Sequence, residues 1–491
     1  MYYIGVDLGT SAVKLLLTDN RGNIKNCISK EYPISFPAPN YAEQNPTDWY
    51  NAVIDGISEL VKGYGREVNG ISFSGQMHGL VMLDENDNVI RPAILWNDGR
   101  TTKECDYLNN EIGLDVVASQ TGNLALTGFT APKLLWVKNN EPDNFDKIHK
   151  IMLPKDYIAY KLTGVFATDV SDASGTLLFD VKNRTWSDKM LEIVGIGKDK
   201  LPTVYESYEV IGSIREDLAK VLNLNPNTSV IIGGGDQAVG AVGTGTVGDG
   251  RCCVSLGTSG VVFASSDKFG MKPETTLHSF CHADGSYHYM GVMLSAAASN
   301  KWWCDEILHT KDYGMEQRNI TKLADNNVFY LPYLMGERTP INDPYARGTF
   351  VGMTMNTTRE DMTLAVLEGV AFALRDSFEL IKALGVNITR VRINGGGAKS
   401  TLWKKIIANV FNVHVDTINT EEGPAFGAAI LAMTGCGAYP DVVSATDSLI
   451  KVVNSVSPDE ELVKLYDKKY EKFKKIYPAL KPVYKELESC L

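Results

Sequence analysis

The hexapeptide VDLGTS occupies residues 6–11, and VSLGTS occupies residues 254–259. Each copy follows a run of strand-forming residues and precedes another such run, so each predicts a β-hairpin with Leu-Gly-Thr-Ser at its turn. The copies lie near the starts of the two halves of the 491-residue chain. An internal repeat of this kind indicates two related structural units. We therefore predict two similar domains, over residues 1–246 and 247–491.

Helix and strand patterns alternate through both halves. Residues 48–61 have helical spacing, and residues 401–410 also read as a helix. Short apolar runs predict strands at residues 70–74, 230–232 and 391–394. This alternation predicts an α/β fold. Near the C-terminus, residues 460–477 predict one helix with a packed aromatic side and a solvated lysine face.

The composition restricts the partners and the compartment. With 48 basic and 59 acidic residues, the chain carries a formal net charge of −11, which disfavours nucleic acid and anionic membranes as partners. No stretch has the length of uncharged apolar sequence that a membrane span requires, and the first residues lack a signal-peptide pattern. The eight cysteines are scattered. We therefore expect reduced thiols and a cytoplasmic protein.

The two Gly-Thr turns are candidate phosphate-binding elements. Glycine lets backbone N–H groups approach an anion closely, and the hydroxyls beside it add donors. Lys14, on the strand after the first turn, is a candidate phosphate contact, although a lysine on the outer face of a strand is an equal alternative. Each turn alone is also compatible with an ordinary hairpin. The candidate ATP-binding residues here are Thr10, Ser11, Gly257 and Thr258.

Two aspartates are candidates for the chemistry. Asp7 ends the first strand beside the turn, where its carboxylate would hold Mg²⁺ through water; a hydrogen bond to its own turn is the alternative. Asp236 follows Gly233–Gly235 at the start of a predicted helix. We interpret it as a general base whose backbone is cleared of side chains so that substrate can approach, rather than as a helix cap. At the matching offsets the second copy has Ser255 and Val262 in place of Asp7 and Lys14, so only the first copy brings an acid and a cation.

Two loops after strands have the composition of a sugar site. Residues 74–79 (SGQMHG) interleave polar His78 with small glycines, and residues 96–100 (WNDGR) supply an aromatic plate and hydroxyl-binding groups in Trp96 and Asp98. Sugars bind to such mixtures of apolar faces and polar groups. Ordinary surface loops are the alternative for each.

A third glycine-rich loop, residues 395–400 (GGGAKS), precedes the predicted helix 401–410. Small residues there would let a base or ribose lie against the backbone, so Gly396, Gly397 and Ser400 are candidate ATP contacts. The loop lacks the glycine spacing of a Walker motif. Residues 243–248 (GTGTVG) fit a dinucleotide fingerprint but precede a strand instead of a helix. The histidines and cysteine at 278–282 lack a fourth zinc ligand at a suitable spacing.

Taken together, these residues resemble the FGGY family of carbohydrate kinases, within the actin-like ATPase fold. The resemblance spans most of the chain, from residues 3–11 to residues 422–429. Its most specific motifs match the branch that acts on D-xylulose and lie at residues 76–79, 94–100, 130–136 and 278–283.

The resemblance implies two ribonuclease H-like (actin-like ATPase) domains facing a central cleft. It implies ATP and Mg²⁺ as cofactors, and D-xylulose and its 5-phosphate as acceptor and product, within xylose metabolism. It assigns Asp236 as the catalytic base and Asp7 as the residue that assists the metal and phosphates. The other implied contacts are Met77 and His78 for the sugar, Thr10 and Thr258 for the phosphates, and Gly396 and Gly397 for adenosine.

One position departs from the branch pattern. Members often carry Asn after the catalytic Asp, whereas this chain has Gln237, whose longer amide would shift the sugar that it contacts. A kinase for another ketose or polyol therefore stays open as an alternative, as does a non-catalytic ATP-binding protein of actin-like fold. We keep a homodimer as an open expectation for assembly.

Overall fold

Two seven-stranded sheets form the frame of the protein. The computed structural model describes residues 1–420 and 422–488. The first sheet has the order β13-β14-β5-β1-β2-β3, with β15 paired to β5. The second has the order β18-β19-β17-β16-β22-β23-β24. The strands of the first sheet are β1 (Tyr2–Leu8), β2 (Ala12–Asp19), β3 (Ile24–Glu31), β5 (Val68–Gly75), β13 (Val210–Ser213), β14 (Ser229–Ile231) and β15 (Gly234–Gly235). Those of the second are β16 (Cys252–Leu256), β17 (Gly260–Ser266), β18 (His278–Cys281), β19 (Tyr287–Met293), β22 (Arg390–Asn394), β23 (His414–Ile418) and β24 (Val452–Val456).

The two sheets share a pairing pattern, which confirms the predicted repeat. In the first, β1 pairs antiparallel with β2 and parallel with β5. In the second, β16 pairs antiparallel with β17 and parallel with β22. The predicted hairpins, and the predicted strands at 70–74, 230–232 and 391–394, therefore all lie within these sheets. The α/β class and the presence of two related sheets are confirmed, and the boundary between residues 246 and 247 stays a prediction.

The two hairpin turns differ in length. Leu8 pairs with Val13, whereas Leu256 pairs with Gly260, so the second turn is one residue shorter. As a result Lys14 lies opposite Asp7, while Val261 lies opposite Ser255. The sequence offset pointed to Val262 as the counterpart of Lys14, and that prediction is wrong by one residue.

Helices cover both sheets. α1 (Pro46–Leu60) buries Trp49, Val53 and Ile57 in the core of the first sheet. α13 (Arg359–Ala383) and α14 (Thr401–Phe411) share the second core with β16 and β17. Both helices predicted from the sequence at 48–61 and 401–410 are thus present. None of the helices in the described part of the chain combines the length and apolar character needed to cross a membrane.

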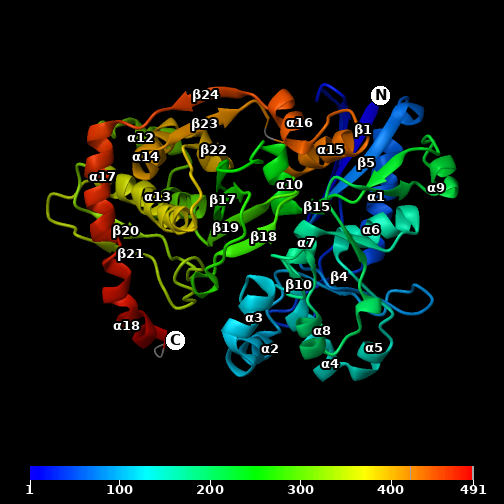
Figure 1. Cartoon of the computed structure of the whole chain (residues 1–491). Coiled ribbons are helices and arrows are strands. Elements are labelled where there is room, and N and C mark those ends of the chain that lie inside the picture. Colours follow the sequence, from blue (N-terminus) through cyan, green and yellow to red (C-terminus); the bar gives the residue numbers. More distant parts are fainter. Residues whose placement is uncertain (421, 489–491) are drawn as a thin grey trace.

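The C-terminal helix is shorter than predicted. α17 (Glu460–Phe473) ends at Phe473, and a separate helix, α18, covers Ile476–Glu488 (Figure 1). A continuous helix is disfavoured because Pro478 has no N–H for the carbonyl of Lys474, whereas proline fits the first turn of a new helix.

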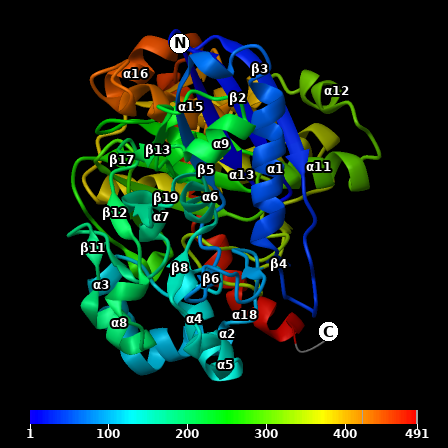
Figure 2. The same cartoon turned by 90° about the vertical axis from the view of Figure 1, so that its right-hand side faces the viewer.

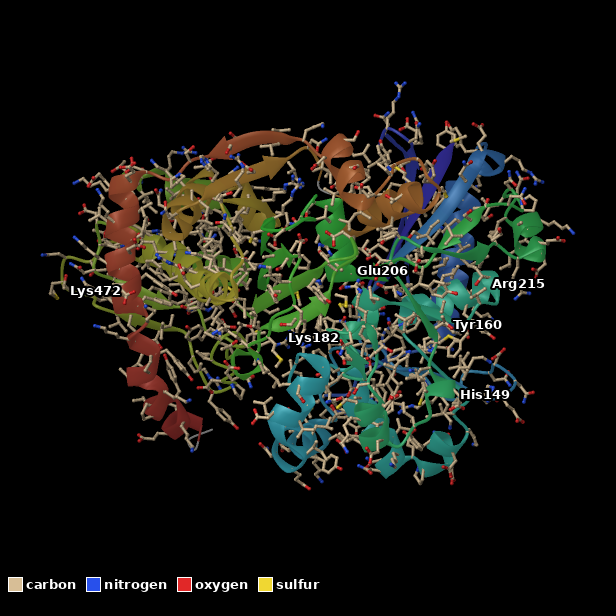
Figure 3. The ribbon with its side chains drawn as sticks, in the orientation of Figure 1. His149, Tyr160, Lys182, Glu206, Arg215 and Lys472 are labelled. Carbon is tan, nitrogen blue, oxygen red and sulfur yellow. The ribbon has the colours of Figure 1, made fainter. Side chains whose placement is uncertain are left out.

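The lysine face of α17 is only partly solvated. Lys472 is exposed and points away from the body (Figure 3). Lys469 is buried, and its ammonium lies 2.6 Å from Glu368 on α13. The expectation of a wholly solvated lysine face is therefore wrong at Lys469, because a buried acid on the neighbouring helix pairs with it.

The two halves join through α10 (Asp236–Gly243) and α15 (Gly423–Gly435). A Cβ on Gly243 would overlap the carbonyl oxygen of Gly423, so only glycine permits this helix crossing. α15 also packs against β1 and β5 of the first sheet, and Figure 1 shows it beside β1. A helix from the second half of the chain thus completes the core of the first sheet.

A mainly helical module is inserted between β5 and β13 of the first sheet. Figure 2 shows α4 (Thr130–Asn140), α5 (Pro142–Asp146) and α8 (Asp188–Val194) grouped at the end of the molecule opposite α16 (Val442–Leu449). α6 (Pro154–Thr163) and the five-residue α7 (Val170–Ser174) connect this module to the strand ends of the first sheet, because α6 contacts β5 and α7 contacts β15.

Candidate active site

The first Gly-Thr turn is held by hydrogen bonds on its backbone. The N–H of Gly9 donates to Ala12 across the turn (3.0 Å), and the hydroxyl of Tyr32 donates to the carbonyl of Gly9 (2.5 Å). The side-chain amide of Gln44 donates to the carbonyl of Thr10 (2.7 Å). The turn is therefore rigid at the backbone, which suits a preformed site for an anion.

Asp7 lies at the end of β1, next to this turn. Its Oδ1 accepts a hydrogen bond from Ser74 of β5 (2.9 Å). Burial raises the pKa of Asp7 to about 6, although Ser74 and Lys14 act in the opposite direction. Lys14 does not neutralise this carboxylate by direct contact, because its ammonium pairs with Glu422 instead.

Asp236 is the first residue of α10. The N-cap position is taken by Gly235, so Asp236 lies one residue inside the helix, which disfavours the alternative of a simple cap. Burial and then the charge of Asp7 raise the pKa of Asp236 to about 7. The side-chain amide of Gln237 lies 3.4 Å from Oδ1 of Asp236. The structure therefore brings the two candidate aspartates and Gln237 together.

The three glycines before Asp236 have a different role from the one predicted. Gly233 has φ +72° and would overlap the carbonyl of Phe73 if it carried a Cβ. A Cβ on Gly234 would lie 2.6 Å from Oγ of Ser171, and one on Gly235 would lie 2.9 Å from Cγ of Met77. The glycines thus allow the chain to pack against other protein atoms, and the prediction that they clear space for substrate is wrong.

His78 and Met77 lie beside this turn. His78 has φ +68°, and its Nδ1–H donates to the carbonyl of Gly175 (2.7 Å), which leaves Nε2 as an acceptor. Burial, and then the charge of Lys133, lower the pKa of His78 to about 3, so the ring is neutral. Its ring contacts Phe129 and also Phe280 of the second half, with centroids 4.7 and 6.4 Å away. Residues of both halves therefore meet at the candidate sugar site.

Trp96 and Asp98 have different surroundings. The indole N–H of Trp96 donates to Oγ1 of Thr10 (2.9 Å), so a predicted sugar residue contacts a predicted phosphate residue. The carboxylate of Asp98 is fully buried and accepts four hydrogen bonds, three from Arg100 and one from the backbone of Ala42. Those bonds use its acceptor capacity, which favours a structural role for Asp98.

The second Gly-Thr turn lies beside the third glycine-rich loop. A Cβ on Gly395 would lie 3.0 Å from the N atom of Gly257, so Gly257 and Gly396 belong to neighbouring loops. Thr258 is exposed, and Gly396 is exposed with no atom within 4 Å of a Cβ placed on it. This open surface fits the predicted contact with adenosine. Gly397 instead packs against Leu256.

Ser400 is engaged within the protein. It caps α14 by accepting from the N–H of Trp403 (3.0 Å), and its hydroxyl donates to Gln317 (2.5 Å). Its hydroxyl is therefore occupied by the helix cap, and this geometry does not favour a nucleotide contact. Ser11 is exposed at the first turn, and its carbonyl accepts from the N–H of Tyr32 (3.1 Å).

The acidic side chains at this site fit a Mg²⁺ ion whose ligands come mainly from the ATP phosphates and water. Within residues 1–420 and 422–488, no group of three or more His, Cys, Asp or Glu side chains could hold a metal ion by itself. Asp7 offers a partly exposed carboxylate whose pKa is raised, and Asp236 adds a second negative charge beside it. A divalent cation bound to phosphates and water would relieve this repulsion.

Three contributors to this site were not predicted from the sequence. They are Ser74 as the partner of Asp7, Glu422 as the partner of Lys14, and the carbonyl of Gly175 as the partner of His78. Glu422 belongs to the motif at residues 422–429, but that motif does not indicate its pairing with Lys14. The sequence around Gly175 does not indicate its contact with His78, because Gly175 and His78 are far apart in the sequence.

Comparison with known proteins gives the class. The model of the FGGY family of carbohydrate kinases, N-terminal domain, matches residues 2–243, and that of the C-terminal domain matches residues 252–436. Together with the paired sheets and the two aspartates, these matches show that the chain belongs to the FGGY family of carbohydrate kinases.

Three relatives are similar along nearly the whole chain. A xylulose kinase from Escherichia coli K12 is 40% identical over 98% of this chain and 99% of its own length. A structure described as a xyloylose kinase from Brucella ovis has a TM-score of 0.93 at 40% identity, covering 98% of this chain and all of that one. A gluconate kinase from Lactobacillus acidophilus also has a TM-score of 0.93, at 28% identity, and covers 99% of both chains.

Proposed function

We propose that this protein transfers the γ-phosphoryl group of ATP to the C5 hydroxyl of D-xylulose and releases ADP and D-xylulose 5-phosphate. The observation that carries the proposal is Asp236, which begins α10 beside Asp7 and has a pKa raised to about 7. Its turn packs against Met77, in the loop that also carries His78. An acid, a sugar loop and a phosphate turn therefore converge at one place.

Asp236 acts as the general base. Its carboxylate accepts the hydrogen bond of the sugar hydroxyl and takes its proton as the new O–P bond forms and the bond to the leaving ADP oxygen breaks. A pKa of about 7 suits this step better than the ordinary aspartate value of about 3.9, because the base strength rises while much of the group stays ionised at neutral pH.

The remaining residues bind and orient the substrates. Neutral His78 presents Nε2 as an acceptor for a sugar hydroxyl, and Met77 supplies an apolar surface. The turns with Thr10, Ser11, Gly257 and Thr258 hold the phosphates, Lys14 adds a cation, and Gly396 borders the adenosine. Mg²⁺ would be positioned by Asp7 through water and would supply charge neutralisation on the phosphates.

Another ketose or polyol remains the alternative acceptor. Gln237 departs from the Asn that often follows the catalytic Asp, and a gluconate kinase shares the same overall fold. Overall similarity therefore cannot select the acceptor, and the local contacts of Gln237 must do so. We place the reaction in the cytoplasm, in xylose metabolism. We also propose a homodimer, which sedimentation of the purified chain would test.

A panel of acceptors tests the proposal. ADP release is measured with ATP and Mg²⁺ in the presence of xylulose, ribulose, fuculose, gluconate or glycerol, with EDTA as the metal-free arm. We expect the largest kcat/KM with xylulose and no turnover with EDTA. A larger kcat/KM with another acceptor would replace xylulose, and no ADP release with any acceptor would favour a non-catalytic ATP-binding protein.

A further inference from the structure

A fully buried lysine lies behind the glycine turn that carries Asp236. The ammonium of Lys155, in the first turn of α6, lies 2.6 Å from Asp156 and 2.9 Å from Asp169. Asp172 is 3.8 Å away, and all four side chains are completely buried. One cation among three carboxyl groups is costly to bury, so the cluster requires a reason beyond packing.

Asp169 is the centre of this cluster. It caps α7, and its Oδ2 accepts from the N–H and the hydroxyl of Ser171 (2.8 and 2.5 Å) and from the hydroxyl of Ser207 (2.7 Å). Its Oδ1 contacts Lys155. We use the term Asp169 network for Lys155, Asp169, Ser171 and Ser207.

The two serines of the Asp169 network hold both ends of the glycine turn. Oγ of Ser171 accepts a hydrogen bond from the N–H of Gly235 (3.1 Å). The carbonyl of Ser207 accepts one from the N–H of Gly233 (3.0 Å). Because Gly235 directly precedes Asp236, the network fixes the backbone from which the candidate base projects.

The turn has no freedom to move away from these partners. Gly234 and Gly235 pair with Ser74 and Gly75 of β5. A Cβ on Gly75 would lie 2.8 Å from Cβ of Lys155, so the lysine stem packs on the same strand end. The strand on one side and the Asp169 network on the other therefore hold the turn between them.

The other end of α7 reaches the sugar loop. Gly175, which follows α7, accepts the hydrogen bond from His78, and the hydroxyl of Ser174 accepts one from the N–H of Cys281 in β18 (3.0 Å). α7 thus links the turn of Asp236, the ring of His78 and a strand of the second half.

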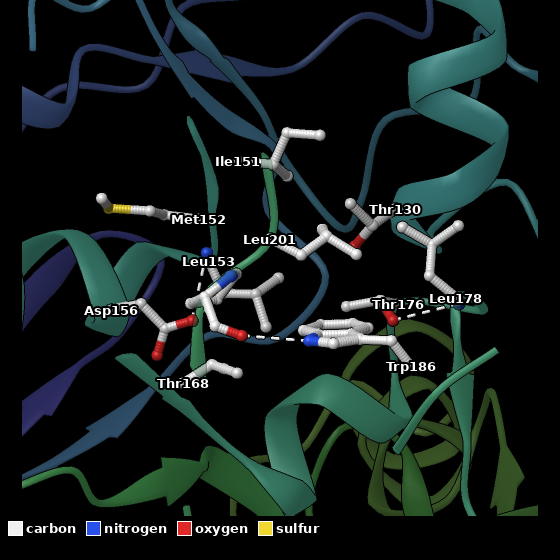
Figure 4. A pocket seen from close by; sticks show the side chains of 11 residues that line it. Thr130, Ile151, Met152, Leu153, Asp156, Thr168, Thr176, Leu178, Trp186 and Leu201 are labelled. Carbon is white, nitrogen blue, oxygen red and sulfur yellow. Dashed lines mark hydrogen bonds between the residues drawn. The ribbon is translucent and has the colours of Figure 1, made fainter. Parts of the chain in front are cut away.

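The cavity that adjoins Asp156 is small. Asp156 lines a cavity of about 10 Å³ with Thr130, Thr168 and Trp186, the size of a single water (Figure 4). The dashed lines in that view join groups of the protein, such as the N–H of Leu153 and Asp156 (3.3 Å). A cavity of this size is too small for a substrate.

We propose that the Asp169 network positions Asp236 for phosphoryl transfer, with Ser171 as the residue that controls the aim of the carboxylate. This inference rests on the proposed function of Asp236. None of the network residues needs to touch the substrate. Positioning of this kind affects turnover more than sugar binding, because an error of about 1 Å at the reacting group costs up to about 100-fold in rate.

The test uses the full-length Ser171→Ala protein, with Ser207→Ala as a second variant. Ser72→Ala is the matched control, because Ser72 is a buried serine of β5 outside the network and its hydroxyl has no hydrogen-bond partner in the described residues. We expect kcat to fall by about 10- to 100-fold in Ser171→Ala, with KM for the sugar little changed and Ser72→Ala unaffected.

Two further measurements separate positioning from loss of folded protein. A looser turn lets water reach Asp236, so the acid limb of the pH–rate profile moves to lower pH in Ser171→Ala, whereas fewer folded molecules would leave the limb in place. In an Asp236→Asn background, Ser171→Ala causes no further loss of the residual rate if Ser171 acts through Asp236.

The outcomes distinguish the two claims. An unchanged kcat and acid limb in Ser171→Ala and Ser207→Ala, with an inactive Asp236→Asn, would overturn the positioning role and leave the proposed function intact. A loss of activity that only follows the loss of folded protein would overturn it as well. Full activity in Asp236→Asn would overturn the proposed function, and the positioning role with it.

Discussion

Lys14 on β2 forms an ion pair with Glu422, the residue that directly precedes α15. The pair joins the hairpin of the first sheet to the helix by which the second half packs on it. Both side chains are partly exposed, at 40% and 30%, so the pair contributes little to stability. The pair instead bears on the proposed nucleotide site, because Lys14 would exchange the carboxylate of Glu422 for a phosphate when ATP binds.

We predict that Glu422→Gln lowers KM for ATP, by about 2- to 5-fold, because it removes a negative charge beside the phosphates and frees Lys14. Lys14→Gln raises KM for ATP by a similar factor. Both effects shrink at high salt, since the pair is partly exposed. Glu461→Gln, which breaks an exposed pair with Lys464 on α17, is the control. A rise of KM in Glu422→Gln would contradict this account.

The pH dependence of turnover follows from Asp236. Its pKa is raised to about 7, and the base must be ionised, so kcat/KM rises with pH up to about 7 and then levels off. The main cause is burial, and the second is the charge of Asp7. Steady-state rates between pH 5 and 9 test this. If kcat/KM instead falls only below about pH 4, then either the pKa of Asp236 is unperturbed or another residue is the base.

The raised pKa of Asp236 also makes the free energy of unfolding depend on pH. A carboxyl whose pKa is raised on folding favours folding while it is protonated, and this contribution is lost as the pH rises from about 4 through about 7. We therefore predict that Asp236→Asn raises the thermal midpoint by about 2 °C at pH 8 and by less at pH 5. A lower midpoint at pH 8 than that of the unmodified protein would contradict the buried, ionised carboxylate.

Local patterns predicted much of this fold. The hairpins at 6–11 and 254–259 and the helices at 48–61 and 401–410 were predictable because strand alternation, glycine turns and helical spacing are short-range properties. The candidate base was predictable from three glycines before an acid. The structural role of these glycines was not predictable. The atoms that exclude a side chain from Gly233 and Gly234 belong to Phe73 and Ser171, which are far away in the sequence.

Long-range packing accounts for what could not be predicted. The placement of α15 on the first sheet depends on the glycine crossing with α10, and the burial of Lys469 depends on Glu368. The composition of residues 96–100 favours a sugar contact for Asp98. In the structure, however, the carboxylate oxygens of Asp98 accept hydrogen bonds from Arg100 and from the backbone of Ala42. Such pairings are set by tertiary contacts that no local pattern contains.

Two neighbouring glycines give a further prediction for the nucleotide. Gly396→Ala should fold normally, because nothing lies within 4 Å of the new methyl group, yet it should raise KM for ATP by about tenfold if adenosine lies against this backbone. Gly397→Ala should instead lower the thermal midpoint, because its methyl would lie 2.8 Å from Leu256 and 3.0 Å from Trp403. An unchanged KM for ATP in Gly396→Ala would remove this loop from the nucleotide site.

In the proposed reaction, the carboxylate of Asp236 removes a proton from a bound ketose. The most direct measurement pairs calorimetric titration of D-xylulose with ADP release in the Asp236→Asn protein. We predict that kcat falls by about 1,000-fold while the sugar Kd changes by less than about tenfold. Turnover close to that of the unmodified protein, with intact sugar binding, would contradict it.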